Sequence, residues 1–94
     1  EHLKGCKHIS KIILHECPLL ENEALKELRY VSESLLFLQV SRCAEITEVG
    51  LLHLINLKKL RTLIIFGLPY IKERVKILDT LTNDMKQCKV TFDE

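Results

Sequence analysis

Few glycines and no long apolar run are found in this chain of 94 residues, and each absence excludes a class of protein. With three glycines in all, there is no glycine-rich phosphate loop, and the Gly-x-Ser-x-Gly pattern of a hydrolase nucleophile is also missing. The longest apolar run, Leu63 to Leu68, has six residues, whereas a membrane helix needs about 18. No convincing catalytic set is left, so the sequence predicts a protein that is not an enzyme, needs no cofactor and does not span a membrane.

An excess of charge is lacking as well, because the formal net charge is +1. That balance gives no electrostatic footprint for nucleic acid or anionic lipid, and we expect no nucleic-acid partner. Two local basic clusters are more typical of a solvated surface than of a ligand site: His2, Lys4, Lys7, His8 and Lys11, and then Lys58, Lys59 and Arg61. The chain also lacks an initiator Met and a targeting peptide, and we therefore expect a processed form or a part of a longer protein.

What the sequence does contain is a repeat. Its clearest copy reads Leu35-x-x-Leu38-x-Val40-x-x-Cys43-x-x-Ile46, which is the signature of a leucine-rich repeat. Helical spacing follows it, with Leu51, Leu54 and Leu57 three apart. The first residues of the successive copies are Ile9, Leu35, Leu60 and Met85. They predict about three and a half repeats, near residues 9–34, 35–59 and 60–84, with a terminal half-repeat at 85–94.

The predicted fold class is therefore α/β, a leucine-rich repeat solenoid. In this right-handed β-α superhelix a parallel sheet lines the concave face and the helices lie outside. The expected strands are Lys11–Leu14, Phe37–Val40, Thr62–Ile65 and Gln87–Thr91, with Leu14, Val40, Ile65 and Val90 as one row of neighbours. The expected helices are Glu23–Val31 capped by Asn22, Glu48–Leu57 capped by Thr47, and Tyr70–Leu81 opened by Pro69.

The two ends of such a stack differ. At the C-terminal end, Lys86, Lys89, Asp93 and Glu94 would protect a free strand edge. At the N-terminal end, residues 1–8 read as the end of a helix, and no polar cap is visible beside Ile12, Leu14 and Cys17. We therefore expect an N-terminal capping element outside this chain, or a partner that covers this edge.

The residues between the buried columns of each strand should point to the concave face, because side chains alternate along a strand. Ile13, Phe37, Ile64 and Phe66 would form an apolar patch there, a candidate site for binding another protein. The complete predicted site is Lys11, Ile13, His15, Phe37, Gln39, Ile64, Phe66 and Lys89. An alternative is that the apolar residues pack on one another or lie under the expected N-terminal element.

Three of the four cysteines, Cys17, Cys43 and Cys88, fall on repeat columns, which favours reduced core thiols over a disulfide framework. The pairs Cys6-x-His8 and His15-x-Cys17 have the composition of a zinc site. In the predicted register, however, His15 points to the concave face while Cys17 points into the core. We therefore expect no metal site.

Several segments resemble a known family. Residues 42–50, Arg-Cys-Ala-Glu-Ile-Thr-Glu-Val-Gly, look like the cysteine-containing class of leucine-rich repeats that is common in F-box proteins. Together with Leu14-His15-Glu16-Cys17 and the segment from Gly67 to Arg74, they are similar to the repeat domain of the mitochondrial coupling factor B family, also called ATP synthase subunit s.

The resemblance implies a non-enzymatic, peripheral accessory factor of energy coupling on the matrix side of the mitochondrial inner membrane, with the ATP synthase as partner. It also implies an N-terminal capping domain and a redox-sensitive Cys-x-Cys pair, whose positions here are His15 and Cys17, so that Cys17 alone is a redox candidate. Two alternatives remain: an assembly factor for the distal membrane arm of respiratory complex I, and the substrate-recognition module of an F-box ubiquitin ligase.

Overall fold

The computed structural model describes residues 9–93, which form a mixed α/β unit with a four-stranded parallel sheet and three α-helices. In chain order the elements are β1 Lys11–His15, α1 Asn22–Lys26, β2 Phe37–Ser41, α2 Glu48–His53, β3 Thr62–Phe66, α3 Arg74–Asp84 and β4 Lys89–Asp93. The expected helical end within residues 1–8 lies outside the described residues. Among the described helices, none is both long and apolar enough to cross a membrane.

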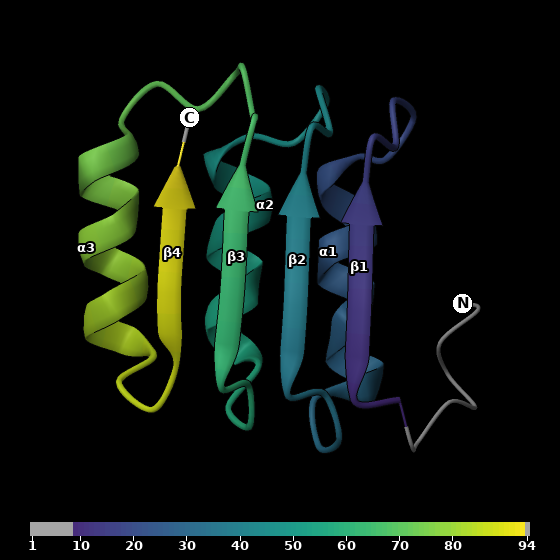
Figure 1. Ribbon diagram of the computed structural model, residues 1–94, viewed down its shortest axis with the longest axis vertical. Coiled ribbons are helices and arrows are strands. Elements are labelled where there is room, and N and C mark those ends of the chain that lie inside the picture. Colours follow the sequence, from purple (N-terminus) through teal and green to yellow (C-terminus); the bar gives the residue numbers. More distant parts are fainter. Residues whose placement is uncertain (1–8, 94) are drawn as a thin grey trace.

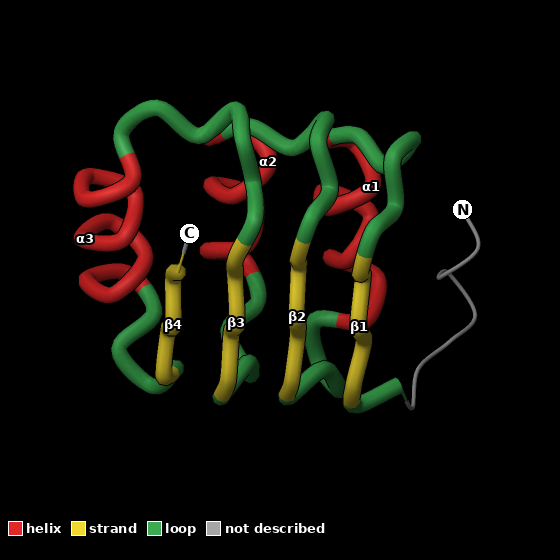
Figure 2. The backbone as a smooth tube through the Cα atoms, turned by 45° about the horizontal axis from the view of Figure 1, so that its top comes forward, coloured by secondary structure: helices red, strands yellow, loops and turns green. Residues whose placement is uncertain are grey.

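The strands lie side by side in sequence order, β1-β2-β3-β4, and each is parallel to the next. Figure 1 shows α1 and α2 behind the sheet and α3 beside β4, so that no described helix covers the front of the sheet. The tilted view of Figure 2 shows the same arrangement, with loops joining strands and helices at both ends of the sheet. We call the uncovered front the open face.

The sheet is in register from end to end. One row on the helix-facing side runs Ile12, Leu38, Leu63 and Val90, and a second runs Leu14, Val40, Ile65 and Phe92. The central members Leu38, Val40, Leu63 and Ile65 are completely buried. Three members of the predicted row are therefore confirmed and the fourth is wrong, because Phe92 takes the place that was expected for Val90.

The error in the fourth strand has a physical cause. The strands begin at Lys11, Phe37, Thr62 and Lys89, so the last interval is 27 residues where the first two are 26 and 25. The extra length is in α3, which continues to Asp84 instead of ending at Leu81. Gln87 then lies in a turn, where its side-chain amide donates a hydrogen bond of 3.1 Å to the carbonyl of Leu60.

The helices also differ from the prediction at their ends. The first two each finish as 3₁₀ turns, Glu27–Val31 and Leu54–Asn56. Asn22 lies inside α1 and does not cap it; its side chain instead accepts the backbone N–H of Thr47 at 2.9 Å and donates to the Thr47 hydroxyl at 2.8 Å. Thr47 does occupy the N-cap position of α2, although its side chain makes no capping bond.

The third helix starts at Arg74, four residues later than predicted. The carboxylate of Glu48 accepts the backbone N–H groups of Lys72 at 2.8 Å and Glu73 at 3.1 Å. These two bonds fasten the segment after Pro69 to the neighbouring helix α2 as an irregular loop. Because the N–H groups of Lys72 and Glu73 already donate to Glu48, they need no capping side chain from their own segment.

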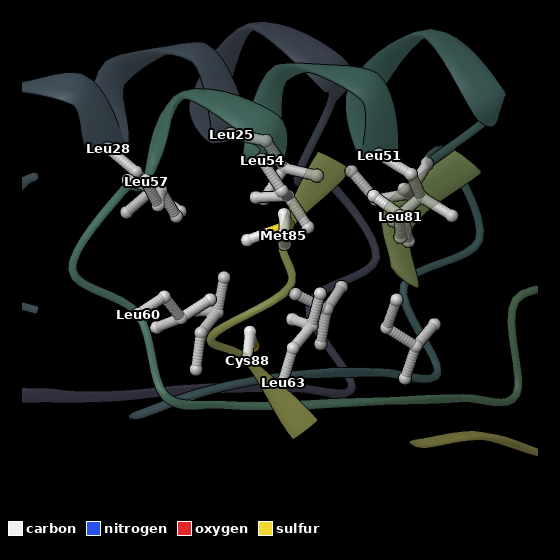
Figure 3. Packing of buried hydrophobic residues seen from close by; sticks show 14 of the residues in the cluster. Leu25, Leu28, Leu51, Leu54, Leu57, Leu60, Leu63, Leu81, Met85 and Cys88 are labelled. Atoms are coloured by element: carbon white, nitrogen blue, oxygen red, sulfur yellow. The ribbon is translucent and has the colours of Figure 1, made fainter. Parts of the chain in front are cut away.

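The core lies between the helices and the sheet. Figure 3 shows Leu25, Leu51, Leu54 and Leu81 extending from the helices towards Leu60, Leu63 and Cys88. At the β1 edge Ile12, Leu14 and Cys17 are only partly buried, whereas Leu38, Val40 and Cys43 beside them are completely buried. Three core positions at the β1 edge are therefore less covered than the equivalent positions of β2.

The backbone repeats one unusual conformation directly after each of the first three strands. Glu16 and Arg42 both have φ of 52°, and Gly67 has φ of 67°. A positive φ is uncommon outside glycine, so its recurrence at the same place indicates three copies of one local structure. The turns that follow are also alike: the backbone N–H of Leu20 donates to the carbonyl of Cys17, and that of Ile46 to the carbonyl of Cys43, each at 3.1 Å.

Candidate docking surface

The structure brings all eight predicted site residues to the open face. They alternate with the buried residues of their strands, so they belong to three rows that cross the sheet. The rows are Lys11–Phe37–Thr62–Lys89, Ile13–Gln39–Ile64–Thr91 and His15–Ser41–Phe66–Asp93. A surface made from one face of paired strands is rigid, because every member is fixed by the register of the sheet.

The apolar part of the open face is continuous but unevenly exposed. Ile13 is 51% exposed, while Phe37, Ile64 and Phe66 are half-buried. Part of this cover comes from polar neighbours: the Nζ atom of Lys11 lies 5.1 Å from the centroid of the Phe37 ring, and the His15 ring lies 6.2 Å from that of Phe66. A cation over an aromatic face is attracted electrostatically to the ring.

A polar cluster that the sequence did not predict lies at the carboxyl ends of β1 and β2. Ser41 is completely buried, and its Oγ lies 2.6 Å from His15 Nδ1 and 3.2 Å from the amide nitrogen of Gln39. One carboxylate oxygen of Glu16 lies 3.7 Å from His15 Nε2, and the other lies 3.4 Å from the guanidinium of Arg42. The register of β1 and β2 is the signal that would have placed His15 beside Ser41.

Serine, histidine and glutamate in contact have the composition of a hydrolase triad, but the geometry does not allow that chemistry. A nucleophilic hydroxyl must reach a substrate carbonyl, and the Ser41 side chain has no exposed surface. The cluster instead fixes the ring of His15 on the open face. His15 is therefore a positioned surface group that a partner can contact.

The three described cysteines are free thiols. Cys43 and Cys88 are buried, as predicted for core thiols, but Cys17 is only half-buried. Burial raises the pKa of the Cys43 thiol, and burial raises the pKa of Cys88 to about 11. Both thiols are thus poor nucleophiles at neutral pH, and Cys17 is the most accessible of the three.

The candidate zinc ligands do not converge within the described residues. The His15 ring is turned towards Ser41, while the thiol of Cys17 lies 3.6 Å from the carbonyl oxygen of His15. Cys6 and His8 lie outside the described residues. In residues 9–93, no group of three or more His, Cys, Asp or Glu side chains is placed to hold a metal ion.

Comparison with known proteins gives a consistent set of relatives, although no model of a protein family matches the chain. It is 31% identical to ATP synthase subunit s, mitochondrial, of Rattus norvegicus over 96 aligned residues, which cover 99% of this chain and 48% of the relative. Identity to the Bos taurus protein of the same name is 26% over 99% of this chain and 48% of the relative.

The Mus musculus protein of that name is 30% identical over 79% of this chain and 38% of the relative. The chain thus spans about half the length of the curated relatives that it matches. This chain is accordingly similar to mitochondrial ATP synthase subunit s along nearly its whole length.

Proposed function

We propose that this chain is a leucine-rich repeat module that binds another protein through its open face. Three observations support the repeat architecture: the parallel strands follow one another in register, they begin 25 to 27 residues apart, and the same positive φ follows β1, β2 and β3. A repeat unit of about 20–29 residues with one strand and one helix is typical of leucine-rich repeats. The open face then corresponds to the concave face of the solenoid.

The observation that carries the docking function is the apolar strip Ile13, Phe37, Ile64 and Phe66 on a face that no described helix covers. Complete burial of one such side chain stabilises a complex by about 1.5–3 kcal/mol, and the part already buried reduces this to about 1 kcal/mol each. Four side chains then contribute about 4 kcal/mol, which is comparable to the lower estimates of the entropic cost of association. Apolar contact alone therefore gives weak binding.

The polar residues around the apolar strip have to supply the remaining free energy of binding. Lys11 and Lys89 lie at the two ends of the first row, and the ring of His15 is fixed in the third. Charged groups at the rim of an interface mainly determine orientation and the rate of association. We expect the partner to place carboxylates opposite Lys11 and Lys89, and an apolar ridge over Phe37 and Phe66.

The proposed partner is the mitochondrial ATP synthase, and the proposed role is that of a non-enzymatic accessory factor in energy coupling. The support is similarity to proteins named ATP synthase subunit s, at 26% to 31% identity over 99% of the chain. The proposed location is the matrix side of the inner membrane, where the chain associates peripherally. The relatives are about twice as long, and we propose that the capping domain of the full-length protein covers the β1 edge.

Paired substitutions of the two aromatic residues test this proposal. Purified ATP synthase is passed over the immobilised chain and over the Phe37→Ser/Phe66→Ser variant, and the affinities are compared. At about 1 kcal/mol for each aromatic side chain, the double substitution removes about 2 kcal/mol, so we expect affinity to fall about 30-fold. A matched control is Val49→Ser/Leu52→Ser on α2, where both residues are exposed and lie away from the open face.

Unchanged capture by the Phe37→Ser/Phe66→Ser variant would exclude the open face as the docking surface. Equal loss in the control variant would point to a general effect on folding, which the far-ultraviolet circular dichroism of both variants detects. Capture of purified complex I in place of the ATP synthase would keep the docking surface but change the partner.

A further inference from the structure

The loops at the amino ends of the strands are strongly basic. We call them the amino edge; they comprise residues 9–11, 32–37, 57–62 and 85–89, and Figure 1 shows the turns that enter β2, β3 and β4 at one end of the sheet. Six cations and one acid, Glu33, lie there, and a second acid, Asp84, is the last residue of α3. The six cations are Lys11, Lys58, Lys59, Arg61, Lys86 and Lys89.

The opposite end of the sheet has the opposite sign. Its loops, the carboxyl edge, comprise residues 16–21, 42–47, 67–73 and 93, with five acids and two cations. The acids are Glu16, Glu21, Glu45, Glu73 and Asp93, and the cations are Arg42 and Lys72. A net charge of +1 for the whole chain therefore conceals two edges of opposite charge, which composition alone does not reveal.

The cations of the amino edge are exposed, and no described residue neutralises them. None of the six forms an ion pair with another described residue, and Lys11 is the one that contacts a ring, that of Phe37. Their positions follow one another across the sheet, because Lys89 donates its backbone N–H to the carbonyl of Arg61 at 2.8 Å and Arg61 donates to that of Leu36 at 2.9 Å. Leu36, which is the next residue across the sheet after Arg61, has a side chain that is 43% exposed.

We propose that the amino edge binds an anionic lipid bilayer. Five of the six cations are lysines, which act as flexible point charges and suit a diffuse anionic surface, whereas specific binding of a phosphate or carboxylate favours arginine. Nucleic acid would call for aromatic rings interleaved with the cations, and Phe37, beneath Lys11, is the one aromatic residue of this edge. The acidic carboxyl edge is repelled by the same bilayer and turns the basic edge towards it.

This surface overlaps the docking site of the open face at Lys11, Phe37 and Lys89 and is otherwise separate from it. Binding of lipid through Lys58, Lys59, Arg61 and Lys86 leaves Ile13, Ile64 and Phe66 available to a protein partner, since none of these four cations is in a strand. The chain would then stand with its strands rising from the bilayer and its open face turned sideways, towards a protein in the same membrane. The proposal does not depend on which protein that is.

Sedimentation with vesicles tests the proposal directly. The chain is mixed with vesicles of phosphatidylcholine alone, or of phosphatidylcholine with about one-third phosphatidylglycerol, at low and at physiological salt. We expect binding to the anionic vesicles alone, and weaker binding at physiological salt, where the screening length falls to about 8 Å. Each lysine near an anionic surface contributes about fivefold to affinity, so the Lys58→Gln/Lys59→Gln variant should bind about 25-fold more weakly.

Two variants separate this proposal from general effects and from the docking function. Lys72→Gln/Lys76→Gln removes two exposed lysines away from the amino edge and should bind vesicles as the unmodified chain does. Ile64→Ser/Phe66→Ser, which lies on the open face outside the amino edge, should also keep vesicle binding, whether or not it captures a protein. Equal binding to neutral and anionic vesicles, or equal loss in the Lys72→Gln/Lys76→Gln variant, would overturn the proposal. Binding to poly-glutamate without binding to anionic vesicles would also overturn it and identify an acidic polypeptide instead.

Discussion

Substitution of Gly50 by alanine gives the sharpest test of how neighbouring repeats are joined. Gly50 is buried in α2, and a Cβ atom at this position would overlap the side-chain oxygen of Asn22 on α1. That oxygen accepts the backbone N–H of Thr47 at 2.9 Å, while the amide nitrogen of the same side chain donates to the Thr47 hydroxyl at 2.8 Å. Gly50→Ala should therefore displace Asn22 and break both bonds between the two helices.

The magnitude follows from two opposing effects. Two lost hydrogen bonds of about 1 kcal/mol each destabilise the fold by about 2 kcal/mol. Alanine in place of glycine inside a helix stabilises it by about 0.8–1 kcal/mol. The net expectation for Gly50→Ala is a loss of about 1 kcal/mol in the free energy of unfolding, or a melting temperature lower by about 4–8 °C for a domain of this size.

A double-mutant cycle with Asn22→Ala isolates the cause. Once Asn22 is shortened, the bonds are already absent and the space beside Gly50 is free, so Gly50→Ala should become stabilising by up to about 1 kcal/mol. The coupling between the two substitutions is then about 2 kcal/mol, measured from urea unfolding followed by far-ultraviolet circular dichroism. An equal effect of Gly50→Ala with and without Asn22 would refute the reasoning.

Three further predictions concern the core and two titrating groups. Leu63→Ala in the centre of the sheet should lower the free energy of unfolding by about 2–5 kcal/mol, and Ile12→Ala, in the same row at the partly covered edge, by less; equal losses in urea unfolding would contradict this burial. The Glu48 carboxylate accepts hydrogen bonds from its own backbone N–H and from those of Lys72 and Glu73, and these bonds hold the pKa of Glu48 below its ordinary value of 4.5. The stability that this carboxylate supplies is therefore present above pH 4.5 and is lost as the pH falls through the lowered pKa. Glu48→Gln should thus cost stability at pH 7 and little in acid, as thermal melts across that range would show; a constant difference would disprove it. Burial raises the pKa of Cys88 from 9.0 to about 11, so the unfolded chain ionises first and the folded state loses stability as the pH rises from 9 to 11. Cys88→Ala should remove that alkaline loss, and a urea midpoint that still falls equally in the variant would argue against it.

The sequence predicted the first three strands and their pairing because its apolar columns keep a nearly constant spacing. Every strand contact from β1 to β3 follows from aligning Ile12 with Leu38 and Leu63. In the last unit Cys88, Val90 and Phe92 alternate with polar residues, so a shift of two positions leaves every side chain on the same face. The pattern therefore predicted the correct face of β4 and the wrong register.

The candidate site was predictable to the same extent, since membership of the open face depends on alternation alone. The register predicts that His15 lies beside Ser41, 26 residues later, but it does not predict which hydrogen bonds these side chains form, because that depends on the side-chain conformations of both repeats. The same limit explains the helix ends. Asn22 has the local character of a cap, but its amide is used by Thr47 of the next repeat, and the delayed start of α3 depends on Glu48, 24 residues before Lys72.

The polar residues at the two ends of the sheet have different tasks, and this difference supports the proposed orientation on a bilayer. At the carboxyl ends of the strands, side chains join one repeat to the next: Asn22 to Thr47, Glu48 to Lys72 and Glu73, and Glu16 to Arg42. At the amino ends, backbone bonds and the side chains of Ser34 and Gln87 hold the turns, and Lys11 contacts the Phe37 ring. Lys58, Lys59 and Lys86 form no ion pair with another described residue, so these three charges remain available to an external anion. Substitution at the carboxyl edge should therefore lower stability before it changes binding, and substitution of Lys58 or Lys59 should do the reverse.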